Sequence, residues 1–197
     1  MVENQIRPNK VSKKPVLEAF EQVPRHLFVP REWKEVAYTD HVIPVSGDHN
    51  LLPPHVFARM IEAASIDHDD NVLDLFSGTG YSTSIISLLA NKVVAIEDSS
   101  IMASIAHFML NKQNIKNSLI ISTPPLEGHV DGAPYDSILI NIPVDSVPAN
   151  LFKQLKDGGR LVAVIKNSDL LGTVTLYEVQ ADHVSERSLF DVTFFCN

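Results

Sequence analysis

The sequence predicts an α/β protein built around a mostly parallel β-sheet. From residue 71 onward, short apolar runs alternate with longer segments of helical periodicity, which is the pattern of buried parallel strands joined by right-handed helical crossovers. The last two apolar runs, residues 172–180 and 188–196, are separated by only seven residues. A crossover helix does not fit into that gap, so we expect these two strands to pair as an antiparallel hairpin.

The expected elements follow from the two periodicities. Unbroken apolar runs bounded by polar residues predict strands, and apolar residues recurring every three or four positions predict helices. We expect strands at residues 71–76, 92–97, 118–122, 135–141 and 160–166, and helices at residues 81–90, 100–112 and 147–155.

The first third of the chain is predicted to be helical and interrupted by prolines. A helix over residues 13–23 has Pro15 in its first turn, and a second over residues 53–66 has Pro54 there, the position where proline is best tolerated. Residues 31–38 are expected to form two helical turns, and residues 44–54, rich in Pro, Gly, Asp and Asn, a loop.

Length and charge limit the classes of protein that are compatible with the sequence. At 197 residues with 45% hydrophobic content, the chain fits one domain. We divide it into an N-terminal helical and substrate-loop segment, residues 1–66, and a Rossmann-like cofactor-binding core, residues 67–197. The net charge of −8 argues against a nucleic-acid partner, although residues 1–34 form a mildly basic arm.

The composition also indicates a cytoplasmic protein. Cys196 is the single cysteine, so an intrachain disulfide and a cysteine-rich metal site are excluded, and a reducing compartment fits. No apolar stretch is long enough for a membrane span or an export signal. The eight histidines show no metal-binding spacing; we therefore expect neither a membrane nor a metal partner.

The stretch VLDLFSGTGYSTS, residues 72–84, carries the strongest chemical signal. It predicts a strand, a glycine-rich turn at Gly78 and Gly80, and a helix beginning near Tyr81, the arrangement that presents free backbone N–H groups to a ligand beyond the end of a parallel strand. Asp74 at the strand end would repel a pyrophosphate. It suits S-adenosylmethionine, which carries a cationic sulfonium and an ammonium; the alternative is that Asp74 only caps the turn.

A second acid lies at the end of the next expected strand. Glu97 follows Asp74 by 23 residues, close to the spacing at which dinucleotide folds place the carboxylate that binds ribose hydroxyls. NAD-binding folds share this feature, so Asp74 alone separates the two cofactor classes. The alternatives are that Glu97 is a polar strand terminus and that Asp98 caps the following helix.

Several motifs together resemble the protein-L-isoaspartate O-methyltransferase family. They are VPRHLFVP at residues 23–30, AYTD at 37–40, the proline pair at 53–54, the glycine-rich turn, APYDSILI at 133–140 and VPANLFKQLKDGGRLV at 147–162. The resemblance implies a Rossmann-like seven-stranded methyltransferase fold with an N-terminal extension. It also implies S-adenosylmethionine as methyl donor and methylation of a carboxylate at isoaspartyl sites in damaged proteins.

The resemblance implies the cofactor-binding positions as well. They are Asp74, Phe76, Ser77, Gly78, Gly80, Tyr81, Glu97, Asp98, Pro124 and Leu126. Two of these depart from the family pattern: Phe76 stands where a glycine is usual, and Thr123, Pro124 and Pro125 replace a Gly-Asp-Gly loop that contacts adenine.

The third departure lies in the expected substrate loop. Leu52 stands where the family has a serine associated with isoaspartyl turnover. His49 and Asn50 are the candidates for orienting an acceptor, and Asp48 and His55 are the other polar groups nearby. The alternative to an isoaspartyl enzyme is a relative that acts on a different acceptor or serves as a non-catalytic binding module.

Overall fold

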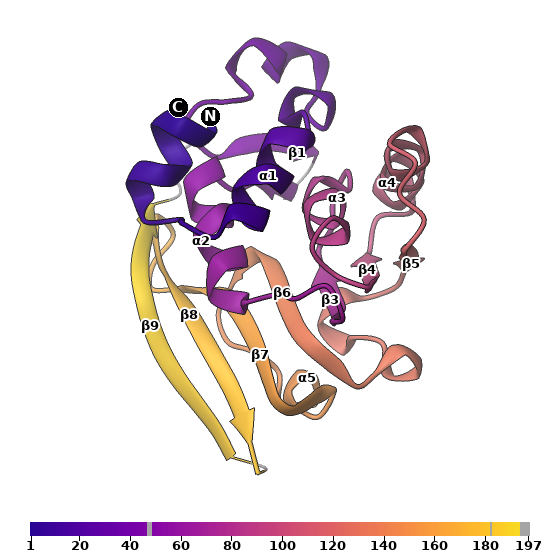
Figure 1. Cartoon of the computed structure of the whole chain (residues 1–197), viewed down its shortest axis with the longest axis vertical. Helices are drawn as coiled ribbons and strands as arrows, with labels where there is room; N and C mark the ends of the chain where they lie inside the picture. The colour runs from indigo at the N-terminus through magenta and orange to yellow at the C-terminus, as the bar shows by residue number, and fades with distance from the viewer. Residues whose placement is uncertain (47–48, 182, 194–197) are drawn as a thin grey trace.

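The centre of the computed structural model, which describes residues 1–46, 49–181 and 183–193, is a seven-stranded sheet (Figure 1). Its strands are β3 (Asn71–Leu75), β4 (Lys92–Glu97), β5 (Ser118–Ser122), β6 (Tyr135–Val144), β7 (Leu155–Lys166), β8 (Leu171–Gln180) and β9 (His183–Thr193), in the order β5-β4-β3-β6-β7-β8-β9. Strands β3 to β7 pair in parallel, whereas β8 and β9 pair antiparallel. The predicted mostly parallel sheet with a C-terminal hairpin is confirmed.

The strand order reverses at β3. The chain moves from β3 outward to β4 and β5, and it then returns to place β6 on the other side of β3. In an open parallel sheet, the crevice beyond the carboxyl ends of the strands at such a reversal is the usual ligand site. The glycine-rich turn leaves β3 at this point.

Five α-helices accompany the sheet in the described part of the chain. They are α1 (Lys14–Gln22), α2 (Pro54–Ala64), α3 (Tyr81–Ser87), α4 (Ser100–Lys112) and α5 (Ala149–Phe152). Pro15 and Pro54 lie in the first turns of α1 and α2, as predicted. Ser99, whose hydroxyl accepts from the backbone N–H of Met102, caps α4, so the idea that Asp98 caps this helix is wrong. No described helix has the length and apolar character needed to cross a membrane.

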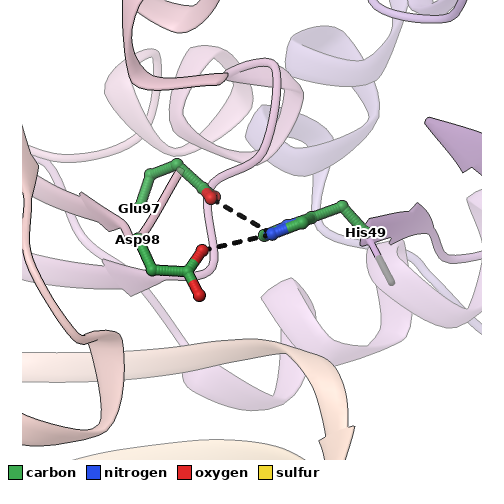
Figure 2. A group of neighbouring side chains, drawn as sticks. All are labelled: His49, Glu97 and Asp98. Atoms are coloured by element: carbon green, nitrogen blue, oxygen red, sulfur yellow. Dashed lines mark ion pairs between the residues drawn. The ribbon is translucent and has the colours of Figure 1, made fainter. Parts of the chain in front are cut away.

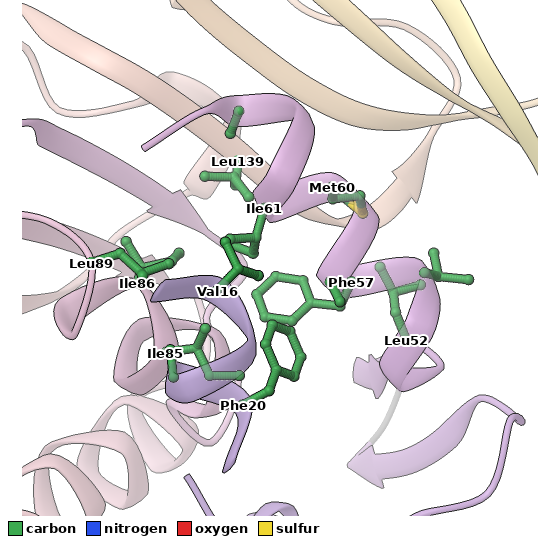
Figure 3. Packing of buried hydrophobic residues seen from close by; sticks show 14 of the residues in the cluster. Val16, Phe20, Leu52, Phe57, Met60, Ile61, Ile85, Ile86, Leu89 and Leu139 are labelled. Carbon is green, nitrogen blue, oxygen red and sulfur yellow. The ribbon is translucent and has the colours of Figure 1, made fainter. Parts of the chain in front are cut away.

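The N-terminal segment shares a hydrophobic core with one face of the sheet (Figure 3). Phe20 of α1 is 1% exposed, and its ring centroid lies 5.7 Å from that of Phe57 on α2 and 6.5 Å from that of Tyr81 on α3. Val72 belongs to this core, whereas Leu73 belongs to a second core on the opposite face, because side chains alternate along a strand. Residues of α1 and α2 therefore share one core with the sheet, and the division into a single domain stays a prediction.

The predicted loop over residues 44–54 contains a small antiparallel hairpin, and the loop prediction is wrong there. It is formed by β1 (Ile43–Ser46) and β2 (His49–Leu51). Ile43 pairs with Leu51 and is 1% exposed against Val29 and Ala37. The burial of Ile43 outweighs the turn preference of the surrounding polar residues. This burial depends on contacts with other elements, so the local sequence cannot reveal it.

Other boundaries also differ from the prediction. Residues 31–36 form a 3₁₀ helix, Arg31–Val36, and α3 ends at Ser87. Helix α5 has four residues, because Leu155 pairs with Tyr135 and already begins β7. Strand β9 begins at His183, inside the segment expected to connect the hairpin, and β8 also pairs with β7. Cys196 lies outside the described residues.

We expect Phe20→Ala to lower the free energy of unfolding by about 3–5 kcal/mol, because it leaves a cavity among three elements. Urea denaturation followed by circular dichroism measures the change. Phe108→Ala is the matched control: Phe108 is 65% exposed on α4, and its loss should change stability by less than about 0.5 kcal/mol. Equal effects of the two variants would contradict the placement of α1 in the core.

Candidate functional site

A buried carboxylate organises the end of β3. Asp74 is fully buried; its Oδ2 accepts hydrogen bonds from Ser82 Oγ at 2.8 Å and Thr83 Oγ1 at 2.6 Å, and its Oδ1 accepts from Asn141 Nδ2 at 2.6 Å. These bonds tie the first turn of α3 and strand β6 to β3. Burial raises the pKa of Asp74 to about 6, because desolvation disfavours the ionised form more than the three bonds favour it.

The turn that follows has left-handed backbone at three positions. Phe76, Gly78 and Gly80 have φ angles of 58°, 55° and 88°. A Cβ atom added to Gly80 would lie 3.1 Å from the Cα of Ala106 on α4, so glycine is required there for close packing. A side chain in this backbone region costs about 1–2 kcal/mol. The conformation of Phe76 explains why a glycine suits this position in the family.

Glu97, at the end of β4, faces this turn (Figure 2). Its Oε2 accepts from the backbone N–H of Gly78 at 2.8 Å and its Oε1 from that of Ser99 at 3.0 Å. His49 of β2 points between the two acids, with Nε2 at 3.2 Å from Glu97 Oε1 and 3.2 Å from Asp98 Oδ1. His49 thus connects the β1–β2 hairpin to the cofactor-side carboxylates.

The pKa values of the two neighbouring acids move in opposite directions. Burial, followed by hydrogen bonding with Asp98, raises the pKa of Glu97, and the same contact with Glu97 lowers the pKa of the more exposed Asp98. Donor atoms of His49, Glu97 and Asp98 lie within 4.8 Å of one another, a spacing that could also hold a metal ion. That no metal binds stays a prediction.

One cavity joins the N-terminal segment to the glycine-rich turn. It is lined by Arg25, Val45, His49, Asn50, Leu51, Leu52, Phe57, Phe76, Ser77, Gly78, Thr79, Tyr81, Ser82, Asn141 and Ile142. The three acceptor-side candidates and four of the predicted cofactor-side positions therefore meet in one space.

The remaining predicted residues lie around or away from this cavity. Asp74 at the end of β3 and Gly80 within the turn do not line the cavity, so direct contact of Asp74 with a cationic ligand stays a prediction. Pro124 is an exposed residue before a short 3₁₀ turn, and Leu126 packs against the second core; neither lines the cavity. His55 pairs with Asp40 at 3.0 Å instead of lining the cavity, and Asp48 lies outside the described residues.

Eight of the residues that line the cavity are absent from the predicted site, and Arg25, Thr79 and Asn141 are three of the polar ones. Arg25 belongs to the VPRHLFVP motif, which supported the family resemblance but to which we assigned no role in the site. Thr79, inside the glycine-rich turn, donates from Oγ1 to the backbone carbonyl of Phe28 at 2.7 Å and holds the two segments together. Asn141 ends the predicted strand and bonds Asp74. Only the position of Asn141 at a strand end on the ligand side of the sheet could have identified it beforehand.

The sheet order, the glycine-rich turn that follows Asp74 and the carboxylate at the end of β4 define the class as a Rossmann-like protein with a nucleoside-cofactor site. The sequence profile of the protein-L-isoaspartate(D-aspartate) O-methyltransferase family matches residues 1–196. The chain belongs to this family.

Individual relatives agree with this assignment. A protein-L-isoaspartate O-methyltransferase of Methanospirillum hungatei is 33% identical over 187 residues, covering 95% of this chain and 87% of the relative, and one of Koribacter versatilis is 33% identical over 194 residues, covering 98% and 87%. A solved protein-L-isoaspartate O-methyltransferase superposes with a TM-score of 0.84 at 26% identity, covering 100% of this chain and 66% of the other.

A second solved structure shows the same fold. It is a Plasmodium falciparum protein assigned to the same family and solved in complex with S-adenosyl-L-homocysteine. It gives a TM-score of 0.80 at 21% identity and covers 98% of this chain and 94% of its own.

We expect the buried Asp74 to make stability depend on pH. Its pKa is raised from 3.8 to about 6 by folding, so its contribution to stability is fully present below the lower value and is lost as pH rises through the higher one. The difference in unfolding free energy between the wild type and Asp74→Asn should therefore fall by on the order of 2–3 kcal/mol between about pH 4 and pH 7.

Chemical denaturation of both proteins at several pH values measures this difference. Any constant effect of the asparagine on packing cancels, because only the slope with pH reports the titration. A difference that is flat with pH would show that Asp74 does not titrate in this range.

Proposed function

We propose that this protein transfers the methyl group of S-adenosylmethionine to the carboxylate of an isoaspartyl residue in a damaged peptide or protein. The observation that carries the proposal is the single cavity in which the glycine-rich turn and the hairpin of the N-terminal segment face each other. Membership of the isoaspartate methyltransferase family supports the acceptor class.

The residues present fit this cofactor. Ser77 Oγ, Tyr81 Oη and Asn141 Oδ1 are buried, have no hydrogen-bond partner and belong to residues that line the cavity. Buried polar groups are normally paired, so these atoms indicate that a polar ligand completes the site. The Ser77 hydroxyl in the turn and the carboxylate of Glu97 would hold the nucleoside, with Glu97 accepting from the ribose hydroxyls.

Methyl transfer to a carboxylate needs little from the protein beyond correct placement of the two reactants. S-adenosylmethionine, when bound, would supply a methyl carbon that bonds to the acceptor oxygen as its bond to sulfur breaks, and the electron pair would stay on sulfur. Because a carboxylate is already ionised, no general base is needed, and the protein contributes alignment and exclusion of water. Apolar Leu52 and Phe57 and half-buried Phe76 supply the dry walls of the cavity.

The hairpin β1–β2 supplies the acceptor side. Leu52 follows it and is 6% exposed, so the side chain at the serine position contributes packing and no hydroxyl. His49 anchors the hairpin to Glu97 and Asp98 and must share Glu97 with the ribose when the cofactor is bound. No observation on the described residues favours the non-catalytic alternative.

We also propose a cytoplasmic location and peptide or protein carboxylates as the sole partner class, without nucleic acid or membrane. The negative net charge and the single cysteine support this assignment.

Labelled methyl transfer tests the proposed function. We expect transfer to an isoaspartyl peptide and none to the matched peptide with a normal aspartyl linkage. Binding of S-adenosylhomocysteine without transfer to the isoaspartyl peptide would overturn the assigned acceptor, and a panel of small carboxylic acids would then identify another.

Glu97→Ala should weaken binding of S-adenosylhomocysteine by about 1.5–3 kcal/mol, the scale of a hydrogen bond to a charged group. Calorimetric titration measures the affinity. Glu127→Ala, a change at an exposed acid away from the cavity, is the control and should bind as the wild type does. Unchanged affinity in Glu97→Ala would remove Glu97 from the cofactor site.

Leu52→Ser should increase isoaspartyl methylation, because it restores the hydroxyl at the family's serine position. The same change should lower the free energy of unfolding by about 2–4 kcal/mol, since Leu52 belongs to the core. Steady-state kinetics and denaturation measure the two effects separately. If stability falls as expected while turnover stays flat, the acceptor is recognised without this hydroxyl.

A further inference from the structure

Arg25 is a buried cation without an anionic partner. Its side chain is fully buried, and among the described residues no carboxylate lies within ion-pair distance of it. Burial lowers the pKa of Arg25, yet a guanidinium stays charged in proteins. Buried charges are normally paired, because desolvation is costly, so an unpaired one needs an explanation.

The guanidinium is held rigidly at the edge of the cavity. Its Nε donates to the carbonyl of Ala37 at 2.7 Å and its Nη2 to the carbonyl of Leu52 at 2.8 Å. The third nitrogen, Nη1, is buried and has no partner, and Arg25 lines the cavity. A fixed planar fork with one free donor is suited to a carboxylate oxygen.

A second unpaired donor belongs to the neighbouring residue. The guanidinium carbon of Arg25 lies 5.0 Å from the centre of the Tyr81 ring, and the buried Tyr81 hydroxyl has no partner within standard hydrogen-bond geometry apart from its side-chain interaction with Arg25 itself. Burial raises the pKa of Tyr81 to about 12, so this hydroxyl keeps its proton and can donate. Of the six unpaired buried polar atoms in the described chain, four belong to residues that line this one cavity: Arg25, Ser77, Tyr81 and Asn141.

We propose that Arg25 and Tyr81 form a carboxylate-binding subsite inside the cavity. The inference rests on the proposed function, which brings two carboxylates to this space: that of the methyl acceptor and that of the amino-acid part of the cofactor. The position of Arg25 favours the acceptor, because the same guanidinium holds the carbonyl of Leu52 in the substrate loop. Methylation of that carboxylate removes its negative charge, so the ester would leave a subsite that the acid had entered.

Tyr81→Phe is the sharpest test, because the hydroxyl that it removes has no partner among the described residues apart from the neighbouring Arg25. The variant should fold with thermal stability close to that of the wild type. Arg25→Lys keeps the charge but loses the planar fork. Ser87→Ala is the matched control: it also removes a buried unpaired hydroxyl, from a residue that does not line the cavity.

Two pairs of ligands, titrated by calorimetry, identify the carboxylate. The first pair is an isoaspartyl peptide and the same peptide with that carboxyl amidated, each added with S-adenosylhomocysteine. The second pair is S-adenosylhomocysteine and its analogue without the carboxylate. In Tyr81→Phe we expect the affinity for the isoaspartyl peptide to fall about tenfold or more, with the amidated peptide and the second pair unchanged.

The other outcomes are equally informative. A selective loss of affinity for S-adenosylhomocysteine over its carboxylate-free analogue would support the subsite and assign it to the cofactor. Wild-type affinity of folded Tyr81→Phe and Arg25→Lys for all four ligands, or an equal loss in Ser87→Ala, would overturn it. Because these titrations measure binding alone, absence of methyl transfer in the wild type would refute the proposed function without affecting the test of the subsite.

Discussion

The buried carboxylate of Asp74 is the constraint on which the site depends. It accepts hydrogen bonds from two hydroxyls of the first turn of α3 and from the amide of Asn141 on β6. These contacts link three elements at the point where the strand order reverses. With the helix start held this close to β3, the intervening turn has little length, and it closes through left-handed backbone at Phe76, Gly78 and Gly80.

The glycine-rich turn determines where a ligand can be bound. Its backbone at Gly78 is bonded to Glu97, so the two strand ends act as one rigid edge. The N-terminal segment completes the space above this edge, through His49 at the two acids and Thr79 bonded to Phe28. The cavity therefore exists only because a segment distant in sequence packs onto the sheet.

The polar groups of this cavity are better suited to binding a ligand than to stabilising the fold. Arg25 and Tyr81 each leave a donor atom outside standard hydrogen-bond geometry, although the guanidinium lies over the Tyr81 ring and that ring packs against Phe28. Unpaired buried donors destabilise a folded protein, and their concentration in one cavity is the kind of local conflict that marks functional sites. The apolar Leu52 at the serine position distinguishes this chain's acceptor side from the pattern that its family resemblance implies.

The sequence by itself determined the order of strands and helices along the chain, the position of the glycine-rich turn, and the two acids, Asp74 and Glu97, at the ends of neighbouring strands. Those features are encoded locally, because unbroken apolar runs, helical periodicity and glycine at left-handed positions need no distant partner. The β4, β5 and α4 boundaries match the expected ones for this reason.

Only the tertiary structure decided the hairpin over the predicted loop, the shortness of α5, and the place of Arg25, Thr79 and Asn141 in the site. Each depends on contacts between residues that belong to different elements: Ile43 with Val29 and Ala37, Leu155 with Tyr135, and Arg25 with Leu52. Such contacts arise from burial and hydrogen-bond satisfaction across the fold, which no short window of sequence contains.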